Sequence, residues 1–393
     1  MASSHDSGAG RDGNPMNGLM RLALKLLLGD RGKFVTLVIG ITFAVFLMML
    51  MTSMFFGIIQ HSAANIINIG AQMWVMDPDV KTPQNSIPMP DYVLDVVRSI
   101  PGVDYAVPLY VGAGLVRLTD GTYQAATVIG LDDATLFGRP ALIHGTALDI
   151  YRNNAFFVVR DANFQKLGSP KMGTTFEIND HRGIVAGIAR VSIGSLFGLP
   201  TLYTTYSRAT QDLPSTRYVM SFILVRPKSA ADVVQIQRAV AKLGYLALTD
   251  REFTARNDHF YEFETAMGTN ILIMTLISFI VGLSIAGETF YMFVLDNLER
   301  FGALKAIGAR SSELIAIIVY QSLVVSFLGF GFGVLLASAL VAFGKLRIPN
   351  YAAVITYQNI FMALGMVLVI SGVSAYIGIR RILRIDPFVV FRS

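Results

Sequence analysis

Four long segments that are almost free of charge constrain this chain more than any other feature. They cover residues 34–59, 267–295, 314–343 and 360–379, and Glu288 is the only charged residue within them. A helix needs about 20 apolar residues to cross the hydrocarbon core of a membrane. The sequence therefore predicts an α-helical membrane protein with one span, a large insertion and three further spans. The first three segments exceed the minimum length, so we expect tilt or continuation beyond the bilayer as stalks.

The insertion between the first and second spans, residues 60–266, has the pattern of a folded domain. Short apolar runs alternate with polar residues, and turn sequences separate these runs. We therefore expect a mixed α/β extracytoplasmic domain on helical stalks. The stretch REFTARNDHFYEFETAMG, residues 251–268, has no strong helix breaker before Gly268. It is predicted to continue into the second span as one helical stalk.

Basic residues beside the spans predict the orientation in the membrane. They precede the first span and follow the second and fourth, whereas the loop at 344–359 holds only Lys345 and Arg347. Because short loops rich in Lys and Arg stay in the cytoplasm, we expect both termini and the hairpin at 296–313 to be cytoplasmic. The insertion would then lie on the far side, together with the 344–359 loop.

The two ends of the chain and the segment before the first span have distinct compositions. Residues 1–18 are polar and rich in Gly and Ser, which is typical of a disordered tail. Residues 19–33 form an amphipathic segment that could lie along the membrane surface, and residues 380–393 form the second cytoplasmic tail. The first span begins too late and is too long for a signal peptide, so we expect it to be retained.

Several function classes are disfavoured by composition and motif. The net charge of +5 comes from basic residues at membrane boundaries, which does not indicate nucleic-acid binding. The chain has no cysteine, so disulfides, iron–sulfur clusters and thiol catalysis are excluded. It also lacks a G-x-x-x-x-G-K-[ST] loop, an H-E-x-x-H pair and a G-x-S-x-G elbow. We therefore expect no catalytic residue and no metal site in this chain.

Three ionisable residues near the spans have two open interpretations each. Glu288 is a functional candidate because a charge inside a membrane is costly, but it lies eight residues before Asp296 and could simply bond to Thr or Tyr neighbours. His61 and His259 flank the outer ends of the first and second spans. They could border a lateral opening and contact a ligand or haem, although interfacial residues without a metal are the favoured interpretation.

Glycines in the third predicted span indicate close helix packing. Gly329, Gly331 and Gly333 lie within LGFGFGVLLAS, and Gly329 and Gly333 form a small-xxx-small pair. Such pairs let two helix backbones approach closely, either within one chain or across a dimer. The motif predicts packing and no particular function.

The hairpin between the second and third spans is the most specific motif. Leu298, Phe301 and Leu304 fall on one flank of a short predicted helix, and Gly308 is placed to end it in the left-handed conformation. Ser311 or Ser312, followed by Glu313, would cap the next helix. An exposed apolar flank on a cytoplasmic hairpin indicates a partner protein, whereas burial against the membrane surface is the alternative.

Two stretches resemble a known family. ERFGALKAIGARSSEL, residues 299–314, resembles the consensus that follows the second span of MacB/FtsX-type permeases, the type VII ABC transporters. RRILRIDPFVVFRS, residues 380–393, is similar to their closing element, through Pro387, Phe391 and Arg392. The pair Phe301-Gly302 replaces the usual acidic-then-Ile-Gly step, which places the chain nearest to the DevC-like exporter branch.

The resemblance implies a permease without enzymatic activity or cofactor of its own. ATP and Mg²⁺ would be bound by a separate cytoplasmic ATPase subunit, and the permease would be a homodimer or half of a heterodimer in the inner membrane, with its domain in the periplasm. Residues 296–309 would be the coupling helix that contacts the ATPase. The implied coupling residues are Leu298, Glu299, Arg300, Phe301, Gly302, Leu304, Lys305 and Gly308.

The family offers more than one output for such a permease. Mechanotransmission to the periplasmic domain would drive export of a lipid-like or amphipathic substrate, with a periplasmic adaptor and an outer-membrane duct as further partners. The alternatives are an FtsX-like scaffold that activates a cell-wall hydrolase and a lipoprotein-releasing permease. FtsX-like outer domains are smaller than the roughly two hundred residues inserted here, which favours export.

Overall fold

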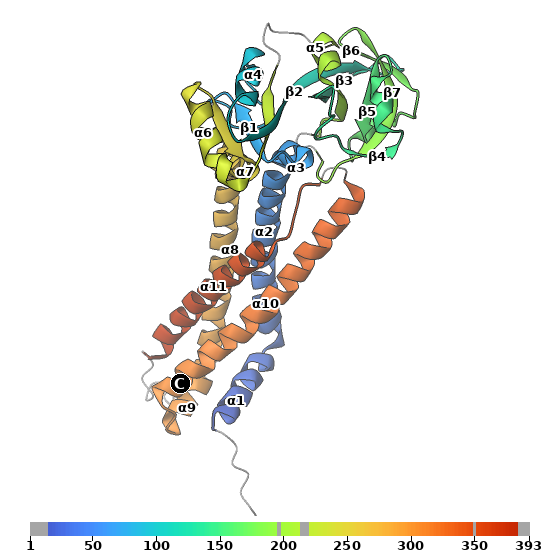
Figure 1. The fold of residues 1–393 in the computed structure, drawn as a ribbon. Coiled ribbons are helices and arrows are strands. Elements are labelled where there is room, and N and C mark those ends of the chain that lie inside the picture. The colour runs from blue at the N-terminus through green and yellow to red at the C-terminus, as the bar shows by residue number, and fades with distance from the viewer. Residues whose placement is uncertain (1–14, 195–197, 213–219, 349–350, 384–393) are drawn as a thin grey trace, which may run out of the picture. The chain divides into compact units, whose positions relative to one another are not determined.

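The computed structural model of the chain describes residues 15–194, 198–212, 220–348 and 351–383 (Figure 1). It divides into two compact units. The membrane unit comprises residues 1–53, 271–343 and 354–393, and the outer unit comprises residues 54–270 and 344–353. Helices α2 and α8 contribute residues to both units.

Long apolar helices make up the membrane unit. Among the described residues, four helices are long and apolar enough to cross a membrane. The predicted arrangement of one span, an inserted α/β domain and three spans is confirmed. The helices of this unit are α1 (Pro15–Gly29), α2 (Arg31–Ser62), α8 (Ala266–Asp296), α9 (Leu298–Ala306), α10 (Ser311–Arg347) and α11 (Tyr357–Leu383).

Glycines set the spacing between α2 and its two neighbours. A Cβ atom on Gly329 would lie 2.7 Å from Ile41 Cβ, and one on Gly333 would lie 2.6 Å from Val45 Cβ. These positions therefore let α10 approach α2 within one chain. A Cβ on Gly331 would meet no heavy atom within 4 Å, so this glycine is not part of the contact. On α8, Gly282 makes a similar close approach to α2, which the sequence analysis did not single out.

Helix α1 packs onto the membrane unit by its apolar side. Ala23 and Leu27 are fully buried, and Gln321 on α10 donates a hydrogen bond to the Ala23 carbonyl at 2.9 Å. The helix begins at Pro15, inside the segment predicted to be a disordered tail of 18 residues. Proline is favoured in the first turn of a helix, where its missing N–H leaves no bond unmade. The rest of that predicted tail, residues 1–14, lies outside the described residues.

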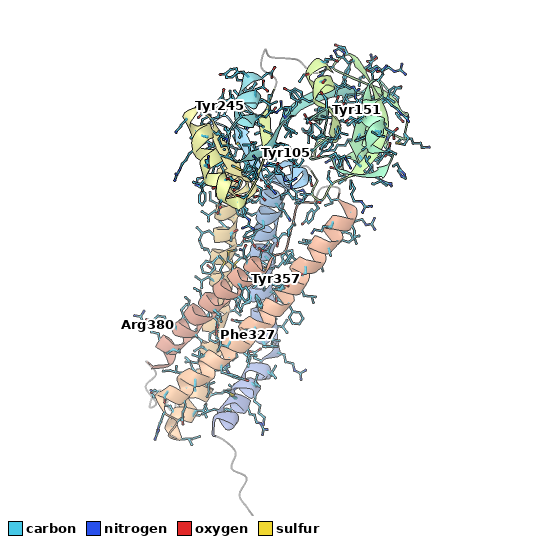
Figure 2. The ribbon with its side chains drawn as sticks, viewed as in Figure 1. Tyr105, Tyr151, Tyr245, Phe327, Tyr357 and Arg380 are labelled. Atoms are coloured by element: carbon cyan, nitrogen blue, oxygen red, sulfur yellow. The ribbon has the colours of Figure 1, made fainter. Side chains whose placement is uncertain are left out.

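Helix α11 is capped at its start and bounded by interfacial side chains. The Thr356 hydroxyl accepts a hydrogen bond from the Asn359 N–H at 3.3 Å, and Asn359 Nδ2 in turn donates to Ser53 Oγ on α2 at 3.1 Å. Tyr357 and Arg380 lie near the two ends of the apolar stretch (Figure 2). Aromatic and basic residues favour membrane interfaces. Helix α10 runs to Arg347, four residues beyond the predicted span.

The outer unit contains one ten-stranded sheet in two parts. The first part has the strand order β10-β1-β9-β2, with chain order β1-α4-β2 and then β9-α6-β10. This is the ferredoxin-like βαββαβ arrangement. Val93 and Val97 on α4 and Ile236 and Val240 on α6 are buried against the sheet. The elements are β1 (Met73–Met76), α4 (Tyr92–Arg98), β2 (Val103–Arg117), β9 (Phe222–Pro227), α6 (Val233–Lys242) and β10 (Leu246–Thr249).

The second part of the outer unit is a six-stranded barrel inserted between β2 and β9. Strand β2 is 15 residues long, so its first half pairs with β9 and its second half pairs with β3. The ring β2-β3-β8-β5-β7-β6 closes because β6 pairs with both β7 and β2. The further elements are β3 (Tyr123–Leu131), β4 (Ala141–His144), η1 (Ala147–Tyr151), β5 (Ala155–Val159), η2 (Phe164–Leu167), β6 (Thr175–Ile178), β7 (His181–Arg190), β8 (Thr201–Thr205) and α5 (Tyr206–Asp212).

The connection from the outer sheet to α8 is interrupted, and the predicted continuous stalk is wrong. Helix α7 (Asp250–His259) passes into a short π-helix, η4 (Phe260–Glu264), and Thr265 is extended with φ −109° and ψ 154°. Gly268 permits this break, because a Cβ atom there would lie 1.9 Å from the Glu262 carbonyl oxygen. π-Helical turns often mark functional positions in helices. The first span is followed directly by α3 (Ala64–Ile69).

Candidate functional site

The predicted coupling hairpin is present as the short helix α9 between α8 and α10. Asn297 forms the junction between α8 and α9 and is 3% exposed. Its Nδ2 donates to the Phe293 carbonyl at 2.8 Å, and its Oδ1 accepts from Arg300 Nη1 at 2.9 Å. Asparagine suits such a junction because its amide replaces backbone bonds that are lost where a helix ends. This residue was missed in the sequence, although a polar amide between an apolar span and a short helix was a usable signal.

The end of α9 has the hydrogen bonds of a Schellman cap. The Gly308 N–H donates to the Lys305 carbonyl at 3.2 Å, and the Ala309 N–H donates to the Leu304 carbonyl at 3.0 Å. Gly308 has φ +104°, a backbone conformation that glycine adopts without steric cost. The left-handed helix end predicted at Gly308 therefore occurs in the structure, and the chain turns sharply from α9 into α10.

The start of α10 is capped differently from the prediction. The carboxylate of Glu313 accepts a hydrogen bond from the Arg310 N–H at 2.8 Å. This is the return half of a capping box, in which the third helical residue reaches back to the residue before the helix. No described bond from the Ser311 or Ser312 hydroxyl caps this helix. The serine cap expected from the sequence is replaced by Glu313, which also favours the positive end of the helix dipole.

The apolar flank of α9 is covered within the chain. Phe301 is 1% exposed, Gly302 is buried, and Leu298 and Leu304 are partly buried against the same apolar core of the membrane unit. The exposed apolar flank expected from the sequence is therefore wrong for Phe301. Bulky residues on this side attach α9 to the helix bundle and do not form its outer surface.

The opposite side of α9 remains accessible. Ile307 is 86% exposed, and Ala303, Ala306, Glu299 and Arg300 are exposed beside it. Ile307 was not among the predicted coupling residues, although it lies nine residues after Leu298, which places it on the opposite side of the helix. It directly follows the last helical residue, Ala306, as the C-cap.

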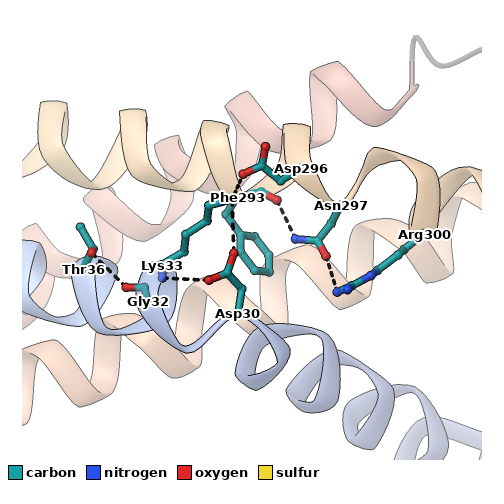
Figure 3. Close-up of polar contacts among 8 residues, drawn as sticks. All are labelled: Asp30, Gly32, Lys33, Thr36, Phe293, Asp296, Asn297 and Arg300. Atoms are coloured by element: carbon teal, nitrogen blue, oxygen red, sulfur yellow. Dashed lines mark hydrogen bonds and ion pairs between the residues drawn. The ribbon is translucent and has the colours of Figure 1, made fainter.

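Polar contacts connect the end of α8 to the start of α2. Lys33 pairs with Asp296 and also lies 3.2 Å from Asp30 Oδ2, so its ammonium group bridges two carboxylates from different helices (Figure 3). Asp30 Oδ1 accepts the Lys33 N–H at 3.2 Å. The backbone N–H and then the ammonium of Lys33, with Arg300 nearby, hold the pKa of Asp30 below its usual value. We call Asp30, Lys33 and Asp296 the α2–α8 ion-pair cluster.

The remaining predicted residues lie apart from α9. Glu288 is on an exposed side of α8 and has no described hydrogen bond, so the predicted bonds to Thr or Tyr neighbours are not found among the described residues. His61 Nδ1 lies 2.9 Å from the Gly194 carbonyl oxygen, and His259 lies 3.7 Å from Glu264 Oε1 and stacks on Phe263. Each histidine therefore has a local partner in the outer unit. Pro387, Phe391 and Arg392 lie outside the described residues.

The fold and the hairpin define a multi-pass membrane protein with an extracellular α/β domain between its first and second spans. Two family models match the chain. The MacB-like periplasmic core domain covers residues 34–243, and the FtsX-like permease C-terminal model covers residues 271–387. The chain belongs to the MacB/FtsX-type family of ABC transporter permeases, and the predicted resemblance is confirmed.

Curated relatives carry the same description. An uncharacterised ABC transporter permease of Mycobacterium tuberculosis is 26% identical over 309 residues, which is 78% of this chain and 80% of the relative. A hemin transport system permease of Staphylococcus haemolyticus is 23% identical over 54% of this chain and 56% of its own length. A macrolide export ATP-binding/permease protein, MacB 1 of Yersinia pestis, is 24% identical over 70% of this chain and 44% of its own length.

Solved structures of outer domains are also similar to part of the chain. The extracellular domain of the ABC-type transporter YknZ from Gram-positive bacteria is 14% identical, with a TM-score of 0.35, and the match covers 46% of this chain and 99% of that domain. The periplasmic region of MacB from Actinobacillus actinomycetemcomitans has the same identity and TM-score, with 91% of its length covered.

Proposed function

We propose that this permease is moved by an ATP-binding partner that contacts α9 on the cytoplasmic side. The observation that supports the proposal is the accessible side of α9 around Ile307, next to a covered side around Phe301. One side of the helix is free for a partner and the other is attached to the bundle. The chain itself has no phosphate-binding loop of the G-x-x-x-x-G-K-[ST] type, so its residues serve as the receiving surface for ATP-driven movement.

The attachments of α9 provide a route for that movement. Phe301 packs into the apolar core that also contains residues of α2, α8 and α10. Asn297 fixes the angle between α8 and α9, and the α2–α8 ion-pair cluster connects α8 to α2. Close-packed interiors transmit displacement because they have little free volume. A displacement of α9 would therefore act on α2, α8 and α10 together.

The outer end of α2 is bonded to α7 within the outer unit. Asn257 on α7 is fully buried and donates from Nδ2 to Ser62 Oγ, at the end of α2, at 2.7 Å. Gln84 Nε2 donates to the Ser62 carbonyl at 2.9 Å. Buried polar bonds of this kind are costly to break, so α2 and α7 move as one body. We infer mechanotransmission, in which ATP-driven movement of α9 reaches the outer unit through α2 and α8.

The proposed output is extrusion of a lipid-like or amphipathic substrate. Relatives are named for macrolide export and hemin transport, and both compounds are large and mostly apolar. The proposed assembly contains two copies of this chain. Only 28% of the most apolar stretch of α8 is buried within the single chain, and Glu288 lies on an exposed side of that helix. A second copy would shield this carboxylate from lipid, which is the environment where a charge is most costly.

Substitution of Ile307 tests the coupling surface. Ile307→Asp places a charge on the accessible side of α9 without touching the apolar core, so the partner should be lost while the protein remains inserted. Leu346→Asp is the matched control, because Leu346 is 84% exposed on α10. We expect at least a tenfold drop in co-purified ATP-binding protein for Ile307→Asp and no change for Leu346→Asp. Equal recovery with both variants would contradict the proposal.

A further inference from the structure

The junction of α7 and α8 is broken although its sequence favours one continuous helix. Residues 250–267 contain neither glycine nor proline, the two strongest helix breakers. The chain nevertheless leaves the α-helical path at Phe260, and Thr265 is extended. A conflict between local propensity and the folded structure is typical of functional positions. The junction, residues 260–268, is therefore a candidate for a second conformation.

The π-helical turn η4 contains one extra residue directly before the break. A π-turn spans five residues between donor and acceptor, whereas an α-turn spans four. The Thr265 hydroxyl donates to the Tyr261 carbonyl at 2.7 Å, so a side chain replaces a backbone bond where the turn ends. The break thus has its own local hydrogen bond, and the chain next to it has a residue to spare.

Two contacts hold the broken form. A Cβ on Gly268 would lie 1.9 Å from the Glu262 carbonyl oxygen and 2.6 Å from its carbonyl carbon, so the two backbones are in close contact. In a continuous α-helix these residues would be separated by about 9 Å along the axis, so the contact exists only in the broken form. Glu264, the last residue of η4, pairs with Lys81 at 2.5 Å. The hydrogen bond from Lys81 lowers the pKa of Glu264, which keeps this carboxylate charged at neutral pH.

A continuous helix would offset the loss of these contacts. The first four N–H groups of a helix have no acceptor within that helix, and α8 begins with Ala266. If α7 and α8 were joined, these groups would donate to carbonyls of the preceding turn. Ala266 and Met267 also have high helix propensity. The two forms therefore exchange one ion pair and one backbone contact for helical hydrogen bonds, a balance that allows both to be populated.

We propose that residues 260–268 are a two-state hinge, which exchanges the observed broken form for a form in which α7 and α8 are one helix. In the broken form, α8 can turn or tilt without moving α7. In the continuous form, a displacement of α8 is passed to α7, whose Phe253 packs against Trp74 in the outer sheet. As a switch in the proposed movement, the inference rests on the proposed function.

Hydrogen exchange of the full chain in nanodiscs tests for the second form. Gly268→Ala adds a Cβ that the broken form cannot accommodate. Amides of residues 265–269 should then gain helical bonds and exchange at least tenfold more slowly. Gly287→Ala is the matched control on α8, because a Cβ there makes only an ordinary contact with Ile377 at 3.7 Å. Unchanged exchange in Gly268→Ala, or faster exchange caused by local unfolding, would overturn the proposal.

Proline at the first residue of α8 gives the opposite variant. Thr265 already has the extended conformation that precedes proline, and proline is accepted in the first helical turn, so Ala266→Pro fits the broken form. In a continuous helix this proline would lie in the interior, where it is strongly destabilising. Ala266→Pro alone should leave the melting temperature unchanged, whereas the double variant with Gly268→Ala should melt well below either single variant. Additive effects would contradict two mutually exclusive forms.

The complex with the ATP-binding partner tests the hinge as a switch. Addition of ATP should change the exchange of residues 265–269 in the parent and not in Ala266→Pro, while recovery of the partner is the same for both. An equal response in Ala266→Pro would overturn the switch and leave the Ile307 test of the proposed function unaffected. The Gly268→Ala experiment needs neither ATP nor a partner, so its outcome is independent of the proposed function.

Discussion

The outer unit and the membrane unit are stabilised by different means. In the outer unit, bulky apolar side chains fill the space between layers, as in the ring cluster of Trp74, Phe222 and Phe253. In the membrane unit, glycines bring backbones together, as where Gly329 and Gly333 face α2. Burial from water cannot drive helices together in lipid, so packing and polar bonds must do so. The comparison teaches that large apolar side chains stabilise the outer unit, whereas glycines at helix contacts stabilise the membrane unit.

The largest expected effect is the loss of bulk in the outer unit. Trp74→Ala removes the largest fully buried side chain from between Phe222 and Phe253. Such truncations cost about 3–5 kcal/mol, because a cavity remains. We expect a strongly lowered melting temperature for the outer unit, measured by circular dichroism of the purified protein. A shift no larger than that of Tyr151→Ala, a truncation at an exposed ring, would break the comparison.

Added bulk in the membrane unit should have the next largest effect. Gly333→Leu forces a side chain against Val45 and should cost about 1–3 kcal/mol, the range for overpacking. Gly331→Leu adds the same side chain on the same helix, where a Cβ meets nothing within 4 Å. We expect the first variant to melt earlier in detergent and the second to match the parent. Equal melting temperatures would show that α10 does not rely on close approach to α2.

The smallest expected effect concerns charge at the α2–α8 ion-pair cluster. Because the pKa of Asp30 is lowered in the folded protein, its stabilising contribution is present above the unfolded pKa of about 3.9. It is lost as pH falls through the folded pKa, since the protonated acid no longer pairs with Lys33. Asp30→Asn should therefore lower the melting temperature slightly at pH 7, and this difference should shrink as pH falls below the unfolded pKa. A difference that does not shrink with falling pH would argue against the ion pair as its source.

Patterns that depend on local sequence were predictable. The spans followed from length without charge, and the left-handed end of α9 followed from Gly308. Strand pairs joined by short turns were also predictable, such as β6 with β7. Each of these features is decided by residues close together in the chain. The family resemblance rested on the same kind of local motif.

Features that depend on distant residues were not predictable. Burial of Phe301 requires the core formed by four spans, and the barrel closes only because Val116 and Arg117 pair with β6. The break at Thr265 follows from close approach of Gly268 to Glu262, which helical propensity does not encode. Exposure of Ile307, in contrast, agrees with helical spacing, because this residue lies nine positions after Leu298 and therefore opposite it.

Backbone hydrogen exchange of the full chain, with and without its ATP-binding partner, tests the central claim most directly. If the partner contacts the accessible side of α9, amides of residues 303–308 should exchange more slowly in the complex. Amides of residues 344–348, at the other end of α10, should exchange at the same rate in both samples. Unchanged exchange at 303–308 in a complex that demonstrably contains the partner would contradict the account.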